Sequence, residues 1–241
     1  MIEVNSLTKR FGHKVAVDNL SFSVKKGEVL GFLGPNGAGK STTMRMVTGF
    51  IPVTSGTISI GEVSMIERPM EAKKKIGYLP ESAPLYNDMT VQGFLKFCAS
   101  MRGLGGSSRK EAVEKAIETC FLETVAHQSI DTLSKGYRHR TCLAQSLLHD
   151  PEVLVLDEPT DGLDPNQKRE VRKLIRNLGK EKAILFSTHI LEEVAEACTR
   201  AVIVDQGTIV ADGTPAELTA QGGGSLYDLF HQVTTSETSA A

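Results

Sequence analysis

Residues 34–41 read Gly34-Pro35-Asn36-Gly37-Ala38-Gly39-Lys40-Ser41. The apolar run Val29–Leu33 precedes them, and a helical pattern over Ser41–Val47 follows. This strand–loop–helix context is the one in which GxxxxGK[ST] wraps phosphates, because the glycines turn N–H groups inward and the helix adds its positive end. We expect Lys40 to reach the β- and γ-phosphates and Ser41 to ligate Mg²⁺. The stretch therefore predicts a nucleoside triphosphate site.

A second signal lies at the end of another apolar run, Val153–Leu156, where Asp157 and Glu158 follow. Ligands bind at the carboxyl ends of strands in α/β sheets, so Asp157 should lie beside the phosphate loop and hold Mg²⁺ through water. Glu158, one residue further on, is placed to polarise water that attacks the γ-phosphate. That general base favours hydrolysis over a small-molecule kinase, which has no use for one there.

A third signal is the segment Leu133-Ser134-Lys135-Gly136-Tyr137. Ser134 is a good N-cap, and the N–H groups from Ser134 through Gly136 are placed to bind an anion. By itself the segment predicts only a helix start. The segment gains a functional interpretation because Ser134 lies twenty-three residues before Asp157 and because the other two motifs are present.

Composition narrows the function. The 241 residues are 40% hydrophobic and 23% charged, with a formal net charge of −2. This balance argues against nucleic-acid binding as the main task. No apolar run approaches the ~18 residues that span a bilayer, and the N-terminus does not resemble a signal peptide. Neither the four cysteines nor the six histidines have a metal-binding spacing, so we expect reduced, buried thiols and no metal held by side chains alone.

Strand and helix patterns alternate along the chain, which predicts an α/β core with parallel strands. A helical block runs from about Val91 to Leu148, interrupted by a flexible turn at Gly103–Ser108. We expect a late hairpin over Ala201–Val210, a hinge at Gly222–Gly224 and disorder over Thr234–Ala241. The remaining segments expected to be regular are strands at Leu20–Val24, Thr57–Ile60, Ile76–Leu79 and Ala183–Phe186, and helices at Asn166–Leu178, Leu191–Ala197 and Pro215–Ala220.

Together these motifs resemble those of the ATP-binding cassette (ABC) ATPases, over roughly Ile2 to Pro215. Residues 34–41 match the family's Walker A motif, and residues 153–158 its Walker B motif with the catalytic glutamate. Residues 133–137 match the signature motif Leu-Ser-Gly-Gly-Gln, with departures at Lys135 and Tyr137. Gly162-Leu163-Asp164 resembles the D-loop, and Ser187-Thr188-His189 the switch-histidine loop.

Two further positions carry the resemblance. Phe11 stands where the family has an aromatic residue that stacks on adenine. Glu81 stands where most members have a glutamine that touches Mg²⁺ and the attacking water, and a carboxylate can also bind Mg²⁺. Residues 77–90, with the altered signature, resemble ATPases of drug-resistance and gliding-motility exporters.

The resemblance implies a P-loop NTPase core with an N-terminal antiparallel β subdomain and an inserted helical subdomain at about residues 85–150. Residues 1–221 would form one ABC ATPase domain, followed by a C-terminal helix and flexible tail over residues 222–241. It also implies a role for each site residue. The implied catalytic residues are Glu158, His189 and Glu81, and the implied Mg²⁺ ligands are Ser41, Glu81 and Asp157. The implied ATP-binding residues are Phe11, Gly34, Pro35, Asn36, Gly37, Ala38, Gly39, Lys40, Ser41, Thr42, Ser134 and Gly136.

The implied partners are ATP, transmembrane permease subunits, and a second copy or a second ABC ATPase, with no nucleic acid. In the family, the signature of one subunit closes on ATP held by another, so Ser134 and Gly136 would complete a site across an interface. A cytoplasmic location on the inner face of the membrane follows, with export as the expected direction. The alternative is a soluble, non-transport ABC ATPase that acts on a macromolecular complex such as the ribosome or DNA.

Overall fold

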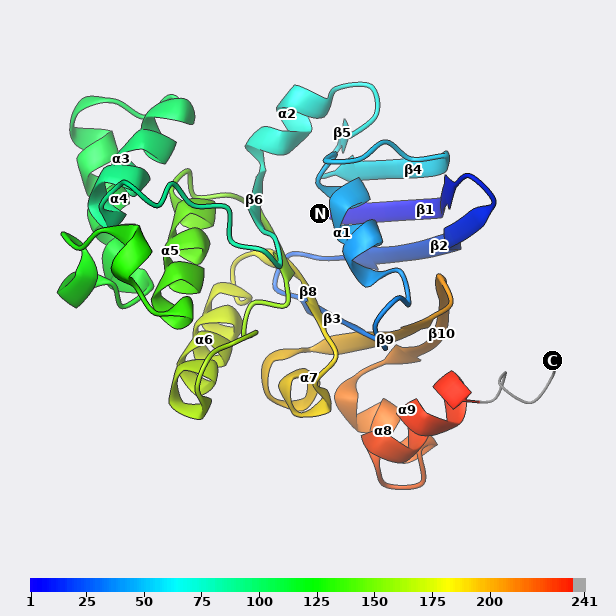
Figure 1. Ribbon diagram of the computed structural model, residues 1–241. Helices are drawn as coiled ribbons and strands as arrows, with labels where there is room; N and C mark the ends of the chain where they lie inside the picture. The colour runs from blue at the N-terminus through cyan, green and yellow to red at the C-terminus, as the bar shows by residue number, and fades with distance from the viewer. Residues whose placement is uncertain (236–241) are drawn as a thin grey trace.

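The computed structural model describes residues 1–235 and contains two sheets with helices packed around them (Figure 1). The smaller sheet is antiparallel, in the order β2-β1-β4-β5, and the larger sheet has the order β10-β9-β3-β8-β7-β6. In the larger sheet β9, β3, β8, β7 and β6 are parallel neighbours, and β10 is antiparallel to β9. The strands are β1 (Ile2–Phe11), β2 (Lys14–Val24), β3 (Val29–Leu33), β4 (Ser55–Ile60), β5 (Val63–Ser64), β6 (Ile76–Leu79), β7 (Val153–Asp157), β8 (Ala183–Thr188), β9 (Arg200–Asp205) and β10 (Thr208–Gly213).

Among the helices, α1 lies between the two sheets, α3 to α5 form a block at one side, and α8 and α9 lie beside β10 (Figure 1). Two single 3₁₀ turns, Glu123–Val125 and Ile130–Thr132, join α4 to α5. The helices are α1 (Lys40–Val47), α2 (Pro69–Lys74), α3 (Val91–Met101), α4 (Gly106–Thr119), α5 (Lys135–Leu147), α6 (Pro165–Leu178), α7 (Leu191–Ala197), α8 (Pro215–Gln221) and α9 (Leu226–Thr235).

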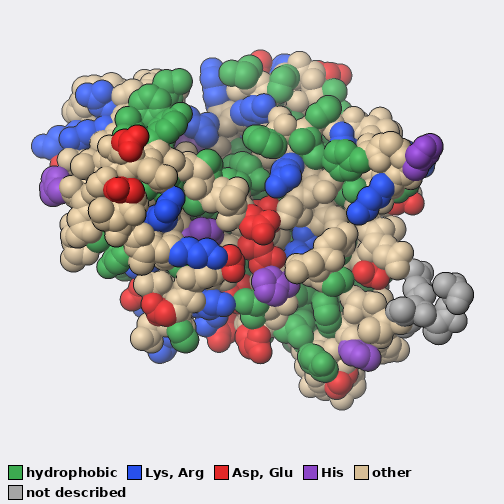
Figure 2. Space-filling model, in the orientation of Figure 1, with side chains coloured by type: hydrophobic (Ala, Val, Ile, Leu, Met, Phe, Trp, Pro, Cys, Tyr) green, Lys and Arg blue, Asp and Glu red, His purple; other side chains and the backbone are tan. Residues whose placement is uncertain are grey.

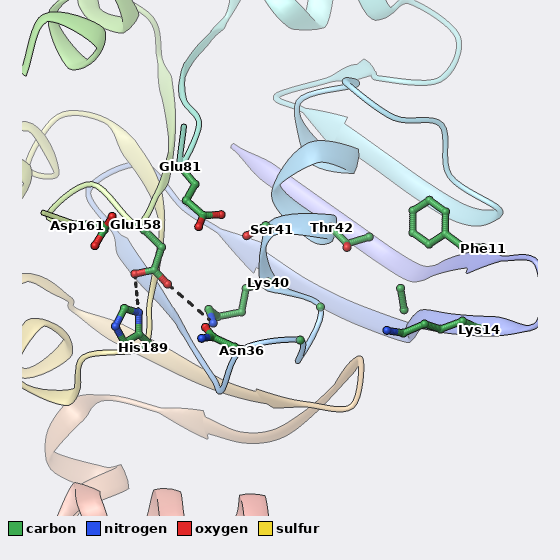
Figure 3. A pocket seen from close by; sticks show the side chains of 13 residues that line it. Phe11, Lys14, Asn36, Lys40, Ser41, Thr42, Glu81, Glu158, Asp161 and His189 are labelled. Carbon is green, nitrogen blue, oxygen red and sulfur yellow. Dashed lines mark hydrogen bonds and ion pairs between the residues drawn. The ribbon is translucent and has the colours of Figure 1, made fainter. Parts of the chain in front are cut away.

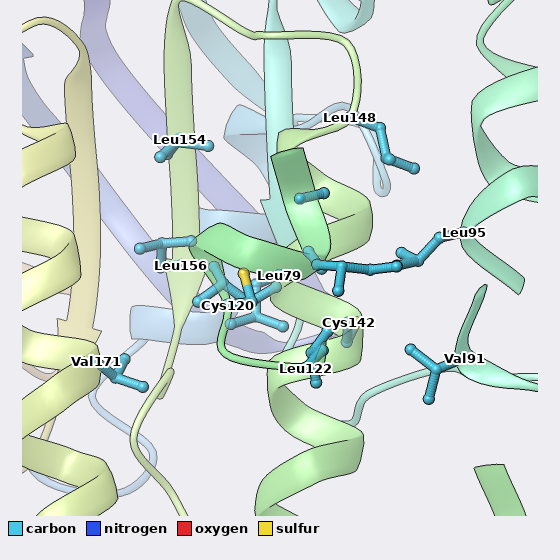
Figure 4. Close-up of a cluster of buried hydrophobic side chains, with 14 of the residues drawn as sticks. Leu79, Val91, Leu95, Cys120, Leu122, Cys142, Leu148, Leu154, Leu156 and Val171 are labelled. Carbon is cyan, nitrogen blue, oxygen red and sulfur yellow. The ribbon is translucent and has the colours of Figure 1, made fainter. Parts of the chain in front are cut away.

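The central strands are apolar throughout because both faces of the larger sheet are covered. Along β7, Val153 and Val155 pack with the smaller sheet and α1. Leu154 and Leu156 point the other way, into a cluster shared with the helical block. Figure 4 shows these two leucines with Leu95, Leu122 and other side chains of that block. The helical block therefore shares its apolar core with the sheet, which holds it beside the strand ends.

The expected α/β fold with parallel strands is confirmed, and two local predictions are wrong. Helix α4 already begins at Gly106, so the predicted turn at Gly103–Ser108 is only half as long; the Ser108 hydroxyl donates to the Gly105 carbonyl at 2.7 Å and supports the first turn. Thr234 and Thr235 belong to α9, and the Thr234 hydroxyl donates back to Phe230. The rest of the predicted disordered tail lies outside the described residues.

The four cysteines form no disulfide within residues 1–235. Cys120 and Cys142 are buried, as predicted, whereas Cys98 and Cys198 are only partly so. Burial raises the pKa of both Cys120 and Cys142 to about 12, so these thiols stay protonated. In the same part of the chain, no helix combines the length and apolarity that crossing a bilayer requires.

Helix α5 covers the outer edge of β6, the last strand of the larger sheet. The Gln145 side chain donates to the Tyr78 carbonyl at 3.1 Å, and His149 Nε2 bonds to the Ile76 carbonyl at 3.0 Å. Burial, with help from Arg102, lowers the pKa of His149 to about 4, so the ring is neutral at pH 7. Gln145 of α5 and His149, two residues past its end, thus bond to carbonyls that a further strand would otherwise bond.

The lowered pKa of His149 predicts a loss of stability in acid. Because the unfolded chain binds this proton near pH 6.5 and the folded chain only near 4, the free energy of unfolding should fall as pH drops across that window. Allowing for the partial exposure of the ring, we expect a loss of roughly 1–2 kcal/mol. Urea unfolding at pH 7.0 and at pH 4.5 measures this difference in the free energy of unfolding. His149→Gln should flatten the slope, whereas His127→Gln, at an exposed position, should leave it steep; equal slopes in all three proteins would contradict the assignment.

Candidate functional site

The phosphate-binding loop joins β3 to α1, as the motif predicted. Gly39 is the N-cap of α1 with φ 103°, and a Cβ there would lie 2.6 Å from the Ala16 carbonyl oxygen. A Cβ on Gly34 would lie 2.3 Å from the Val204 carbonyl oxygen. These two positions therefore require glycine, because the loop passes directly against the backbone of β2 and β9.

Lys40 begins α1 with a buried side chain. Its Nζ donates to the carbonyls of Gly34 at 2.8 Å and Pro35 at 3.1 Å, and lies 3.9 Å from Glu158 Oε1. Burial lowers the pKa of Lys40, and the charges of Glu158, Asp157 and Glu81 oppose that shift. The Lys40 ammonium is thus held inside the loop among carboxylates, in a position to bind phosphate oxygens.

Asp157 ends β7 beside the start of α1. Its Oδ1 accepts hydrogen bonds from the hydroxyls of Ser41 at 3.2 Å and Ser187 at 2.6 Å, whereas its Oδ2 is buried without a hydrogen-bond partner. A buried carboxylate oxygen without a partner is costly, and a cation would relieve that cost. Figure 3 shows the Glu81 carboxylate directed toward Ser41.

These groups fit Mg²⁺. A hydroxyl and two carboxylates are hard oxygen ligands, and Mg²⁺ usually completes its shell with water and substrate phosphates. Within residues 1–235, no group of three or more His, Cys, Asp or Glu side chains is arranged to hold a metal by itself.

Glu158 follows with φ 51°, a left-handed conformation that a non-glycine residue adopts at a cost. Its N–H is fixed by the Ser187 hydroxyl at 3.0 Å. Its Oε2 lies 3.0 Å from His189 Nδ1, and burial raises the pKa of the carboxyl, opposed by His189 and Lys40. The turn directs this carboxylate into the cavity with His189 beside it (Figure 3).

A buried carboxylate holds the segments that carry these two residues, and no sequence motif marks it. Glu193, on α7, is fully buried and accepts hydrogen bonds from the Thr160 hydroxyl and, at 2.7 Å, from the Thr188 hydroxyl. Thr160 lies two residues after Glu158, and Thr188 directly precedes His189. Locally, Glu193 looks like any acidic residue in a first helical turn.

Phe11, at the end of β1, is 51% exposed and lies at the far end of the same cavity. The Lys9 ammonium lies 5.0 Å from the centre of its ring and also donates to the Pro52 carbonyl at 2.6 Å. Lys14 is the partner of Phe11 across the β1–β2 pair. The Phe11 ring is thus held in place with part of its surface free for stacking.

All these groups surround one open cavity of about 440 Å³ (Figure 3). Most of the predicted residues line it, and Lys14, Ala16 and Asp161 line it without having been predicted. Gly34, Pro35 and Ala38 shape the loop behind it, and Asp157 reaches it through Ser41. The lining residues are Phe11, Lys14, Ala16, Asn36, Gly37, Gly39, Lys40, Ser41, Thr42, Glu81, Glu158, Asp161 and His189.

Ser134 and Gly136 do not line this cavity. Ser134 is the N-cap of α5 and is exposed, with its hydroxyl accepting from the Tyr137 N–H at 3.5 Å. Gly136 packs against Gln167, whose Oε1 would lie 2.4 Å from an added Cβ. Lys135 Nζ donates to Asp161 at 2.8 Å and lowers the pKa of that carboxyl. The role predicted for Ser134 and Gly136 on another subunit's nucleotide stays a prediction.

With this geometry in place, comparison with known proteins gives the family. The model of the ABC transporter family matches residues 17–161. The chain belongs to this family. The expectation that it is an ABC ATPase, with that family's fold, is confirmed by this match and by the relatives below.

Two curated relatives and one solved structure illustrate the likeness. YbhF of Escherichia coli K12, a probable multidrug ABC transporter ATP-binding protein, is 39% identical over 222 residues, which are 92% of this chain but only 38% of YbhF. LnrL of Bacillus subtilis 168, the linearmycin resistance ATP-binding protein, is 37% identical over 237 residues, covering 98% of this chain and 75% of LnrL. The structure of an ATP binding subunit of an ABC transporter superposes with a TM-score of 0.87 at 28% identity, over 97% of this chain and 99% of that one.

The site geometry predicts that Lys40 dominates phosphate binding. Lys40→Ala should weaken ATP binding at least about tenfold, because charge-assisted hydrogen bonds contribute ~1.5–3 kcal/mol each. Titration calorimetry with ATP and AMP measures the effect, which should be far smaller for AMP. Lys14→Ala, at the Phe11 end of the cavity, is the control and should change ATP affinity only slightly. Full ATP affinity in Lys40→Ala would contradict the assignment of the loop.

Proposed function

We propose that the chain binds and hydrolyses ATP with Mg²⁺ as the energy-supplying subunit of an ABC exporter. The observation that carries this proposal is the convergence of Lys40, the Ser41–Asp157 pair and the Glu158–His189 pair on one cavity. A phosphate loop, oxygen ligands for a cation and a buried base are what phosphoryl transfer to water requires.

In the proposed reaction each residue has one task. Lys40 and the loop N–H groups bind the phosphates, and Phe11 stacks on the adenine. Ser41, Asp157 and Glu81 would hold Mg²⁺, and the ion would supply positive charge to the phosphates. Glu158 accepts the proton of the attacking water, and its raised pKa suits it for that task at neutral pH. His189 orients the Glu158 carboxylate through the 3.0 Å contact.

The proposal includes a second ATPase subunit, either another copy or a different ABC ATPase. Ser134 is exposed at the start of α5 and lies outside the cavity of its own chain. The N–H groups of that helix end are therefore available to the γ-phosphate on a partner, and ATP would hold the two subunits head to tail. Hydrolysis would remove that bond, and the opening of the dimer would drive transport.

Membrane subunits are the proposed recipients of this motion. An open groove of about 750 Å³ lies between the α1–β6 region and α3, with mostly apolar walls that include Phe50, Met70, Tyr86, Phe97 and Met101. All five side chains are partly or largely exposed, and hydrophobic side chains are frequent on this upper part of the molecule in Figure 2. Exposed apolar surface of this kind suits a helix from a permease subunit. The chain would then lie in the cytoplasm, bound to the inner face of the membrane.

Export is supported by the relatives, whose names refer to multidrug transport and to linearmycin resistance. The chain spans only 38% of the length of YbhF. The low net charge of −2 gives no support to a partner made of nucleic acid.

Replacement of the proposed base separates binding from chemistry. Glu158→Gln should keep ATP affinity and slow hydrolysis by about 10²–10⁴-fold, because only the proton acceptor is lost. With ATP the variant should accumulate as a dimer, measured as a doubled mass by light scattering. Glu158→Gln combined with Ser134→Arg should stay monomeric, because the added side chain blocks the proposed interface. A single variant that remained monomeric at high protein and ATP concentrations would contradict the dimer.

The docking groove is tested at Tyr86, which is 58% exposed and packs edge-on against Phe94 and Phe97. Tyr86→Asp should abolish co-purification with the membrane proteins encoded beside this chain, while ATP affinity stays within about twofold of wild type. Tyr227→Asp, at a tyrosine 63% exposed on α9, is the control and should co-purify normally. A wild-type protein that never co-fractionates with membranes would support the soluble alternative.

A further inference from the structure

His139, in the second turn of α5, is a buried polar residue to which the motifs assign no role. Only 4% of it is exposed. Its Nδ1 lies 3.2 Å from the Pro159 carbonyl oxygen, and its Nε2 lies 3.3 Å from the Glu81 carbonyl oxygen. The ring therefore stands between two segments that both lead into the cavity.

Both acceptors belong to irregular backbone. Glu81 follows the end of β6, and Pro159 follows Glu158 beyond the end of β7. Among residues 1–235, no backbone N–H donates to either carbonyl. Pro159 is buried and Glu81 is exposed. Both acceptors are carbonyls, so a neutral ring donates to one of them at a time, and its tautomer decides which. The imidazole is nevertheless the side chain that lies against both segments at these points.

Comparison with two nearby side chains, Gln145 on α5 and His149 just past its end, separates His139 from its neighbours. Gln145 and His149 each bond to one carbonyl of β6, at Tyr78 and Ile76. His139 continues this row past the end of the strand to Glu81, and it also reaches Pro159 on the β7 side. Of these three side chains, His139 is the one that joins the two segments to each other.

We propose that His139 is a positioning residue that sets the separation of the Glu81 and Glu158 carboxylates and ties both to the helix that carries Ser134. The proposal rests on the proposed ATP hydrolysis, in which these carboxylates face the same phosphate. Small misplacements of catalytic groups are costly, and about 1 Å can lower a rate by ~10²-fold. The contacts of Lys40 with the phosphate loop do not involve His139, so nucleotide binding is separate from this effect.

Three variants dissect the bridge. His139→Leu keeps apolar bulk and removes both nitrogens; His139→Asn restores a donor near the Nδ1 position, toward Pro159; His139→Gln restores one near Nε2, toward Glu81. His139→Leu should lower kcat about tenfold or more with KM for ATP within about twofold. His139→Asn and His139→Gln should each recover part of the kcat that His139→Leu loses. His149→Gln, which loses a ring just past the end of the same helix and away from the cavity, is the control and should keep wild-type kcat.

Amide hydrogen exchange tests the bridge without any ATPase assay. In His139→Leu, amide exchange should be faster both at residues 80–83 and at residues 159–163. In His139→Asn, exchange should be faster only at residues 80–83. In His139→Gln, it should be faster only at residues 159–163. Unchanged exchange in His139→Leu overturns the bridge, and so does equal loosening of the whole helical block. Altered exchange with unchanged kcat overturns the positioning role. Absence of hydrolysis by the wild type would refute the proposed function, while the exchange pattern would still decide whether the bridge exists.

Discussion

The carboxylate of Asp157 accepts hydrogen bonds from the hydroxyls of Ser41 and Ser187. These two hydrogen bonds join three segments that lie far apart in the sequence. The bonds form because the strands that carry these segments end at the same edge of a parallel sheet. Asp157 pairs in register with Ser187, and Leu33 with Thr188. A slip of one residue between these strands would turn the side chains to the opposite face and separate the phosphate loop from its acidic partners. The site therefore depends on strand register, which the apolar runs on both faces of the sheet fix.

Burial then sets the electrostatics of the site. Lys40 and Glu158 are both buried and 3.9 Å apart, and burial lowers the pKa of the lysine and raises that of the glutamate. Each charge limits the shift in the pKa of the other, so the pair keeps opposite charges close together without a full bidentate bond. Phosphate oxygens can take over the ammonium while the glutamate keeps its contact with His189. Figure 2 shows acidic side chains gathered at the middle of the face that it displays. A phosphate ligand that binds among these carboxylates would need a cation to balance their charge.

Helix α5 connects this site to the rest of the molecule. Gln145 on this helix and His149 just past its end cover the edge of β6, and the apolar residues of the helix belong to the cluster shared by the helical block and the sheet. At its start, Lys135 bonds to Asp161, a residue that lines the cavity. Through α5, a movement of the helical block relative to the sheet would reach the site. In the proposed function, the groove beside α3 would be the place where a membrane partner produces or senses that movement.

By itself, the sequence determined the features that consecutive residues encode: the phosphate loop between β3 and α1, the acidic pair after β7 and the N-cap at Ser134. A loop of fixed backbone shape needs glycines at fixed spacing, and a buried strand needs an unbroken apolar run. Both features can therefore be predicted from consecutive residues. The tertiary structure alone decided the roles of Lys14, Asp161, Glu193 and His139. Each of these meets its partners across different elements, and in the sequence Glu193 resembles an ordinary first-turn acid and His139 an ordinary helix residue. Which carbonyl, hydroxyl or carboxylate such a side chain meets depends on strand order and register, which are set by packing over the whole chain.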